Sequence, residues 1–194
     1  WLRELVSPAV TSVELVERLT MAGLKIESAE PVAGLFTGVV VGHVRSVERH
    51  PDAAKLTVCR VWDGAAEHQV VCGAANVRVG LMTAFARAGA QLPGGLTITK
   101  STLRGVESSG MLCSAAELGI ADDSDGIMEL IGSYRAGDGL RDALQLDDVS
   151  LDVELTPNRG DCLSVRGMAR EVGVLFGTAV RQADCAPAPA VIAD

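Results

Sequence analysis

Short apolar runs separated by turn residues fill the middle of the chain, from residue 37 to residue 114. The runs have the length of β-strands and are rich in Val, Leu and Thr, while Gly, Pro, Asn or Asp interrupts them. Five or six such strands within fewer than about 80 residues favour a small closed barrel over a layered α/β fold. The predicted strands lie at residues 39–47, 56–62, 69–72, 81–86 and 96–99.

The segments on either side of this stretch have a different pattern, in which helices appear. Thr11 and Glu14 have the spacing of a capping box, and the apolar residues that follow fall on one helical face until Gly23. Residues 24–31 then alternate as a strand. The order is therefore helix and then strand before the barrel.

The reverse order follows the barrel. Residues 149–155 alternate as a strand, and residues 162–176 have the apolar spacing of a helix, with Asp161 as the predicted N-cap. Between barrel and strand, the sequence predicts a short helix from Ser114 to Gly119, a strand at 127–131 and a helical piece at 140–146. Pairing the two outer strands would make one small domain that the barrel interrupts.

The pattern therefore predicts an α+β protein with an all-β insertion. A split helix–strand/strand–helix domain comprises residues 1–36 and 151–180, and a five-stranded OB-fold barrel is inserted into it. The inserted domain spans 37–150, with the barrel at 37–113 and an extension at 114–150. The Ala- and Pro-rich residues 181–194 are predicted to be a linker, and with the start at Trp1 they suggest a piece of a longer protein.

Composition narrows the class of protein. Hydrophobic residues make up 48% of the 194, which is ample for a core, but no apolar run approaches the roughly 18 residues of a membrane span. Five cysteines occur without a CxxC pair, which favours reduced thiols over a disulfide framework or a zinc site. Cys59, Cys72 and Cys113 fit strand patterns as core residues. We therefore expect a cytoplasmic protein with no membrane contact.

Charge is unevenly distributed along the chain. The net charge is −8, yet residues 37–113 carry eight Lys or Arg against five Asp or Glu. Residues 114–150 carry two against nine. The barrel is thus mildly basic and the extension strongly acidic, which is a weak electrostatic footprint for a nucleic-acid partner.

Candidates for catalysis are few. The chain has three histidines, His43, His50 and His68, for which we expect structural or solvent-exposed roles, and it lacks the common catalytic and phosphate-loop motifs. The acidic loop at 122–126 does not have the ligand spacing of a calcium-binding EF-hand. The sequence therefore predicts no catalytic residue, no metal ligand and no cofactor of its own.

Binding remains as the function class. OB-fold barrels hold oligonucleotides on an exposed sheet face and its loops. Lys and Arg would neutralise phosphates, and Ser would donate to phosphate or sugar oxygens. Aromatic residues are 3% of the chain, so base stacking would be limited. An ordinary solvated charged face is the alternative. The candidate contacts are Arg45, Lys55, Arg60, Lys100, Arg104, Ser108 and Ser109.

Three ordered motifs resemble the OB-fold tRNA-binding domain that occurs alone and attached to aminoacyl-tRNA synthetases. They are HPDAAKL at 50–56, VCGAAN at 71–76 and GVESSGM at 105–111. Residues 1–4, 19–24 and 154–164 in turn resemble the N-terminal region of the bacterial phenylalanyl-tRNA synthetase β subunit, in which an OB domain is inserted into a split α+β domain.

The resemblance implies an (αβ)₂ heterotetramer that uses ATP and Mg²⁺ to attach phenylalanine to tRNA(Phe). The α subunit carries the catalytic site, and the editing site lies in parts of the β subunit that do not fit into the residues present here. This segment would therefore lack ligase and editing activity and would support tRNA binding or architecture. Two other hypotheses stay open at this point. One is an autonomous tRNA-binding module, and the other is a scaffolding barrel with no RNA partner, which the acidic extension favours.

Overall fold

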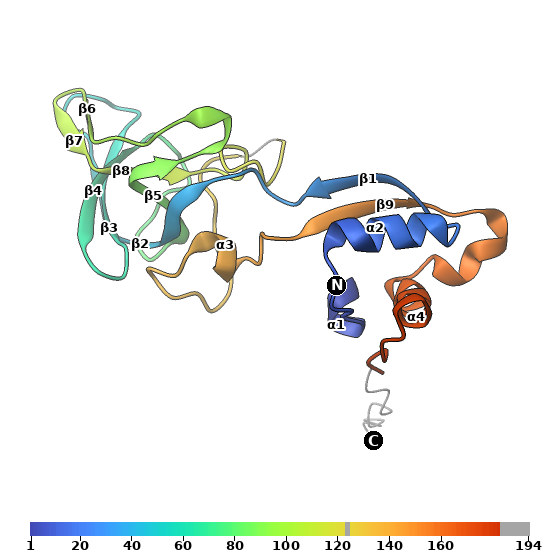
Figure 1. The fold of residues 1–194 in the computed structure, drawn as a ribbon. Helices are drawn as coiled ribbons and strands as arrows, with labels where there is room; N and C mark the ends of the chain where they lie inside the picture. The colour runs from blue at the N-terminus through green and yellow to red at the C-terminus, as the bar shows by residue number, and fades with distance from the viewer. Residues whose placement is uncertain (123–124, 183–194) are drawn as a thin grey trace, which may run out of the picture. The chain divides into compact units, whose positions relative to one another are not determined.

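A computed structural model describes residues 1–122 and 125–182 of the chain (Figure 1). These residues form two compact units: Pro31–Asp148 is one, and Trp1–Glu30 packs with the segment that begins at Val149 in the other. The predicted linker at 181–194 lies almost entirely outside the described residues, as does part of the acidic loop. None of the described helices is long and apolar enough to cross a membrane.

The larger unit is built on a curled five-stranded antiparallel sheet, as the apolar runs predicted. Its strand order is β4-β3-β2-β5-β8, so strands that follow one another in the chain are mostly neighbours. This arrangement is compatible with an OB-like fold. The strands are β2 (Thr37–Arg49), β3 (Thr57–Trp62), β4 (Glu67–Cys72), β5 (Met82–Gln91) and β8 (Gly110–Cys113).

Strand β2 is long enough to pair with two partners, and irregular pairing lets it curl. It pairs with β5 along its first part and with β3 along its second. The register shifts between Val44 and Ser46 on one side and between Thr37 and Val39 on the other. Gly38 lies in the second shift with φ +73, and a Cβ there would approach the Cα of Ala90 to 2.9 Å. Glycine is therefore required at this bend.

Both faces of β2 are buried, which explains the unbroken Val39-Val40-Val41 run. Val40 packs inside the curled sheet with Val61, Val70 and Phe85. The neighbouring valines, on the other face, join a second cluster that includes apolar residues of the acidic extension, namely Leu118, Leu130, Leu140 and Leu146. A strand covered on both faces has no polar alternation. The extension is thus part of this unit and covers one face of the sheet.

The two edge strands of the sheet are linked by hydrogen bonds beside β8. The amide of Ser109 donates to the carbonyl of Gln69 on β4 at 2.8 Å. The hydroxyl of Ser108 accepts from the amide of Val71 at 3.1 Å and donates to the carbonyl of Gly110 at 3.0 Å. These bonds satisfy groups on the exposed edge of β4, which would otherwise be open to pairing with other chains.

The prediction of a fifth strand at 96–99 is wrong, because the fifth strand is β8. Ile98 exchanges backbone hydrogen bonds with the end of β5, through Ala90 and Gly89, but the pairing is a single isolated bridge. The chain turns back at the 3₁₀ turn Pro93–Gly95, and Leu92 also donates to the carbonyl of Leu96 across it. A separate two-stranded hairpin follows, formed by β6 (Ser101–Leu103) and β7 (Val106–Ser108).

The acidic extension contains less regular structure than predicted. Ser114 and Glu117 bond each other's amides at 2.7 and 3.2 Å, but they close only a turn, so no helix forms there. The predicted strand at 127–131 is reduced to one bridge between Glu129 and Thr83. The helical piece is confirmed as α3 (Leu140–Ala143).

The smaller unit has the elements that the flanking patterns predicted. Helix α2 (Ser12–Met21) begins at Thr11, whose hydroxyl accepts from the amide of Glu14. Strand β1 (Lys25–Pro31) pairs with β9 (Val149–Glu154). The short helix α1 (Leu2–Leu5) was not predicted, and the last helix is α4 (Val165–Phe176).

The start of α4 differs from the prediction. Ser164 is its N-cap and accepts from the amide of Gly167 at 3.1 Å. Asp161 ends up in the preceding 3₁₀ segment, η2 (Pro157–Cys162), where its carboxylate binds Arg159 instead. A Cβ on Gly167 would lie 1.8 Å from the carbonyl of Asp161, so this segment packs directly on the first turn of the helix.

Candidate nucleic-acid interface

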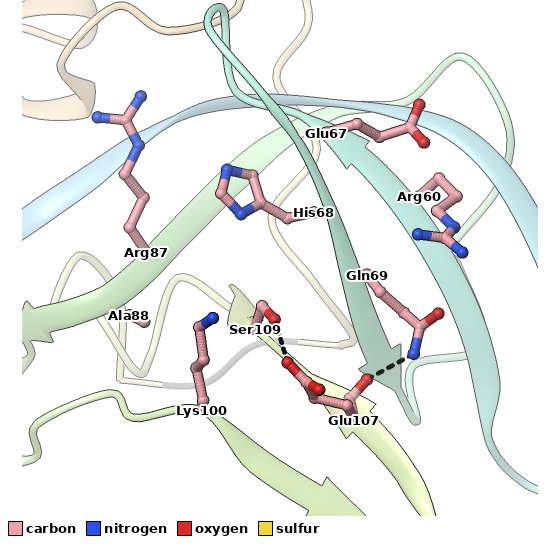
Figure 2. A pocket seen from close by; sticks show the side chains of 9 residues that line it. All are labelled: Arg60, Glu67, His68, Gln69, Arg87, Ala88, Lys100, Glu107 and Ser109. Carbon is pink, nitrogen blue, oxygen red and sulfur yellow. Dashed lines mark hydrogen bonds between the residues drawn. The ribbon is translucent and has the colours of Figure 1, made fainter.

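A groove of about 550 Å³ lies on the larger unit and collects several of the polar residues of the barrel (Figure 2). Strands β3, β4 and β5 and the β6–β7 hairpin contribute to it, and its lining contains both positive and negative side chains. Its lining residues are Arg60, Glu67, His68, Gln69, Arg87, Ala88, Lys100, Glu107 and Ser109.

Cross-strand pairing and short hydrogen bonds hold the floor of the groove. Arg60 on β3 is the direct partner of Gln69 on β4. The Gln69 amide donates to the carbonyl of Glu107 at 2.8 Å, and the Ser109 hydroxyl donates to the carboxylate of Glu107 at 3.2 Å, as the dashed lines in Figure 2 show. Arg60 and Lys100 are therefore presented from a surface whose polar neighbours are already engaged.

A buried carboxylate, that of Asp63, binds two side chains that line the groove, His68 and Arg87. Asp63, in the β3–β4 turn, is 4% exposed, and its oxygens accept from the amides of Ala65 and Ala66, from the His68 ring and from Arg87. Burial by itself would raise the pKa of Asp63, but these hydrogen bonds together hold the pKa well below its usual range. Asp63 therefore stays ionised and neutralises Arg87.

The seven predicted contact residues are spread over the barrel. Arg60, Lys100 and Ser109 lie together in the groove. Arg45 on β2 is exposed and sits over the ring of Trp62, 5.7 Å from its centroid. Lys55 lies in the loop between β2 and β3, and Arg104 lies at the tip of the β6–β7 hairpin.

Ser108 differs from the other six because it is buried, with 2% of its surface exposed. Its hydroxyl serves the edge of β4 and the carbonyl of Gly110. A group engaged in this way has no free face for a phosphate, so we leave Ser108 out of the interface that we propose below.

Ion pairing separates the free cations of the barrel from the bound ones. Arg78 binds Glu129 through both terminal nitrogens, and Arg87 binds Asp63. By contrast, the five cationic candidates are all exposed, and within the described part of the chain none of them forms an ion pair. They are Arg45, Lys55, Arg60, Lys100 and Arg104. An exposed cation without a carboxylate partner is available to an anionic ligand.

Sequence reasoning missed Glu67, His68, Gln69, Arg87 and Glu107 as groove residues. Period-2 alternation on β4 places Gln69 opposite Arg60, and this signal was available in principle. Arg87 follows an apolar run that was predicted to end at Ala86, and its orientation depends on Asp63, which is distant in the sequence.

One group of potential metal ligands occurs among the described residues, in the smaller unit. Asp161, Cys162 and Glu171 place ligand atoms within 4.8 Å of one another. The guanidinium of Arg159 already binds both carboxylates, at 3.2 and 2.8 Å, and holds the pKa of Asp161 below its usual range. The positive charge that a metal ion would supply is thus present, and the group does not fit a metal.

The chain can now be placed among known proteins. Residues 39–139 match the family model described as a putative tRNA binding domain, which is just over half of the chain. The chain therefore belongs to this tRNA-binding-domain family. The prediction made from the three barrel motifs is confirmed.

Relatives extend the likeness to almost the whole chain. The phenylalanine--tRNA ligase beta subunits of Pseudomonas fluorescens and Pseudomonas savastanoi pv. phaseolicola are each 57% identical to it, over 98% of this chain and 24% of their own length. That of Bordetella bronchiseptica is 52% identical over 99% of this chain and 24% of its own length. The resemblance to this β subunit is confirmed, and the chain spans about a quarter of the length of these relatives.

Proposed function

We propose that the chain is the N-terminal part of a phenylalanine--tRNA ligase β subunit and that its barrel contacts the phosphates of tRNA(Phe). The observation that carries the RNA contact is that all five predicted cations are exposed and lack carboxylate partners among the described residues, on a domain of the tRNA-binding family. Phosphate contacts position an RNA without reading its sequence. The segment would thus help to hold tRNA during charging and would carry no ligase or editing site.

The strength of this contact follows from its charge. If each of the five cations neutralised its own phosphate, the slope of log K against log salt concentration would be about −4, which is the upper limit for this set. Glu67 and Glu107 line the same groove and oppose the approach of an anion. We therefore expect weak binding that depends steeply on salt, so that tRNA would need further contacts elsewhere in the complete enzyme.

The rest of the enzyme belongs to the same proposal. We infer an α subunit as partner, in an (αβ)₂ heterotetramer in the cytoplasm, with ATP and Mg²⁺ acting at the catalytic site outside this chain. Reconstitution with an α subunit would test this assignment through assembly and charging.

We also propose the domain organisation that the patterns predicted, with an OB-fold domain at 37–150 inserted into a split domain of 1–36 and 151–180. The pairing of β1 with β9 and the two compact units support it. Replacing residues 32–147 by a short flexible linker should leave a helical, cooperatively folded unit in circular dichroism. The barrel expressed alone, from residue 31 to 148, is the matched control. If neither piece unfolds cooperatively, the proposed insertion is contradicted.

The RNA contact is tested by titrating the chain with tRNA(Phe) at several salt concentrations. Charge reversal of Arg60 and Lys100 to Glu should lower the salt slope by about 2, because two phosphate contacts are lost. Arg166→Glu together with Arg170→Glu changes the net charge by the same amount at two exposed positions of α4 and is the control. Absence of binding at low salt, or equal loss in the control, would overturn the proposal and favour a scaffolding role for the barrel.

A further inference from the structure

A buried histidine joins two loops that are far apart in the sequence. His50 begins the loop between β2 and β3, is 4% exposed, and has its Nε2 atom 3.0 Å from the carbonyl oxygen of Leu103 on the β6–β7 hairpin. Its Nδ1 atom accepts from the amide of Asp52 at 3.1 Å. Because Nδ1 accepts, the proton of the neutral ring is on Nε2, which donates to Leu103.

Each of the two joined loops carries one free cation next to the joint. Lys55 immediately precedes Leu56, whose carbonyl accepts from the amide of His50 at 3.1 Å, so the loop closes beside the ring. Arg104 immediately follows Leu103 at the hairpin tip. Both side chains are exposed, and neither is in an ion pair with any described residue. Asp52 is the single acidic residue in loop 50–56.

The bond from His50 acts near the tip of a short hairpin, whose strand β7 is already joined to β4 through Glu107 and Ser108. Strands β6 and β7 share three residue pairs, and the turn residues Arg104 and Gly105 have φ values of 48° and 82°. A two-stranded hairpin is at best marginally stable alone in water. The bond from His50 to Leu103 therefore restrains the tip that presents Arg104.

We propose that loop 50–56 and the β6–β7 hairpin form one phosphate clamp, in which Lys55 and Arg104 bind the same backbone phosphate of an RNA and His50 is the positioning residue. This inference rests on the proposed RNA contact and adds a site separate from the groove. Neither loop has an exposed aromatic side chain, so the clamp has no platform for base stacking and does not distinguish sequences.

The clamp is tested by the salt slope of tRNA(Phe) binding. Lys55→Ala and Arg104→Ala should each lower the slope by about 1, and the double variant should also lower it by about 1, because the clamp neutralises one phosphate and holds it only while both cations are in place. A loss of about 2 in the double variant, or no loss in either single variant, would overturn the shared site. Arg60→Ala and Lys100→Ala, measured alongside, report on the groove.

His50→Asn tests the positioning role without RNA. The Oδ1 atom of the introduced asparagine can still accept from the amide of Asp52, as in an Asx-turn, but this shorter side chain cannot reach the carbonyl of Leu103. Hydrogen exchange in the β6–β7 hairpin should become faster in this variant, while exchange in β3 and β4 stays unchanged. Unchanged exchange in the hairpin would overturn the role of His50.

RNA binding by the same variant completes the test. With the tip released, we expect His50→Asn to weaken tRNA(Phe) binding and to lower the salt slope by up to about 1. The Lys55 and Arg104 double variant made in its background should then lose little further slope, because the shared phosphate contact is already lost. If the groove variants weaken binding but the clamp variants do not, the clamp is wrong and the proposed function stands. If wild-type protein binds no tRNA at low salt, both are wrong.

Discussion

Nε of Arg87, on β5, donates a 2.7 Å hydrogen bond to Oδ2 of Asp63, in the turn between β3 and β4. The same guanidinium also donates to the backbone carbonyl of Asp63 at 3.0 Å. The bond joins parts of the sheet that are not adjacent strands, and it removes one cation of the groove from competition for phosphate. The Arg87–Asp63 pair therefore both joins β5 to the β3–β4 turn and neutralises the charge of Arg87.

Asp63→Asn should therefore lower the free energy of unfolding by about 2 kcal/mol, because a buried hydrogen bond to a charged group is weakened. The pKa of Asp63 is lowered by folding, so its stabilising contribution is complete above the unfolded pKa of about 3.9. It declines as the pH falls below that value and is lost only when the pH falls through the lower pKa of the folded state. Urea unfolding between pH 7 and pH 3 measures both effects. Asp52→Asn, at an exposed loop position, should change neither.

Alanine variants of Ser108 and Ser109 should differ in stability, because only the Ser108 hydroxyl holds the edge of β4. Ser108→Ala leaves the amide of Val71 without its acceptor and should cost about 1–3 kcal/mol in urea unfolding. Ser109→Ala removes a hydroxyl at the groove surface and should change stability by less than about 0.5 kcal/mol. Equal stability of the two variants would show that the edge of β4 is not held as described.

Gly42 should be required for packing inside the sheet. A Cβ at this position would lie 2.7 Å from Cβ of Phe85 and 3.0 Å from Cγ1 of Val61, so Gly42→Ala forces apart buried neighbours. We expect a loss of about 1–3 kcal/mol in thermal or urea unfolding. Gly73→Ala, which meets Leu56 at an ordinary 3.4 Å, is the matched control and should be tolerated.

Asn76 should hold the acidic extension against the barrel. Its amide donates to the carbonyl of Ile127 at 2.8 Å and accepts from the amide of Ile127 at 3.0 Å. Asn76→Ala leaves both backbone groups unpaired and should cost about 1–3 kcal/mol, with faster hydrogen exchange around Ile127.

Asn76→Asp refines this test. The aspartate keeps the acceptor for Ile127 but loses the donor, and it places a carboxylate beside Glu129, whose pKa Arg78 and Asn76 hold at about 2. We expect it to be at least as destabilising as the alanine variant at pH 7. Wild-type stability in Asn76→Asp would mean that the donor to Ile127 is unimportant.

Local sequence patterns predicted the elements whose signals are local. The Thr11–Glu14 spacing determined the start of α2, and apolar runs between turn residues indicated β2, β3, β4 and β5. The cations of the candidate interface were also evident from the sequence. Residue types and their spacing are enough where hydrogen bonds and burial involve near neighbours.

Tertiary pairing decided the rest. Residues 96–99 look more like a strand than Gly110–Cys113, but the latter pairs with β5 from Ala84 to Arg87 and completes the sheet. Local sequence does not show which of two segments pairs with a strand that is distant in the chain. The availability of each polar side chain was likewise decided in three dimensions, because Arg87 is bound to Asp63 and the Ser108 hydroxyl is bound to the edge of β4.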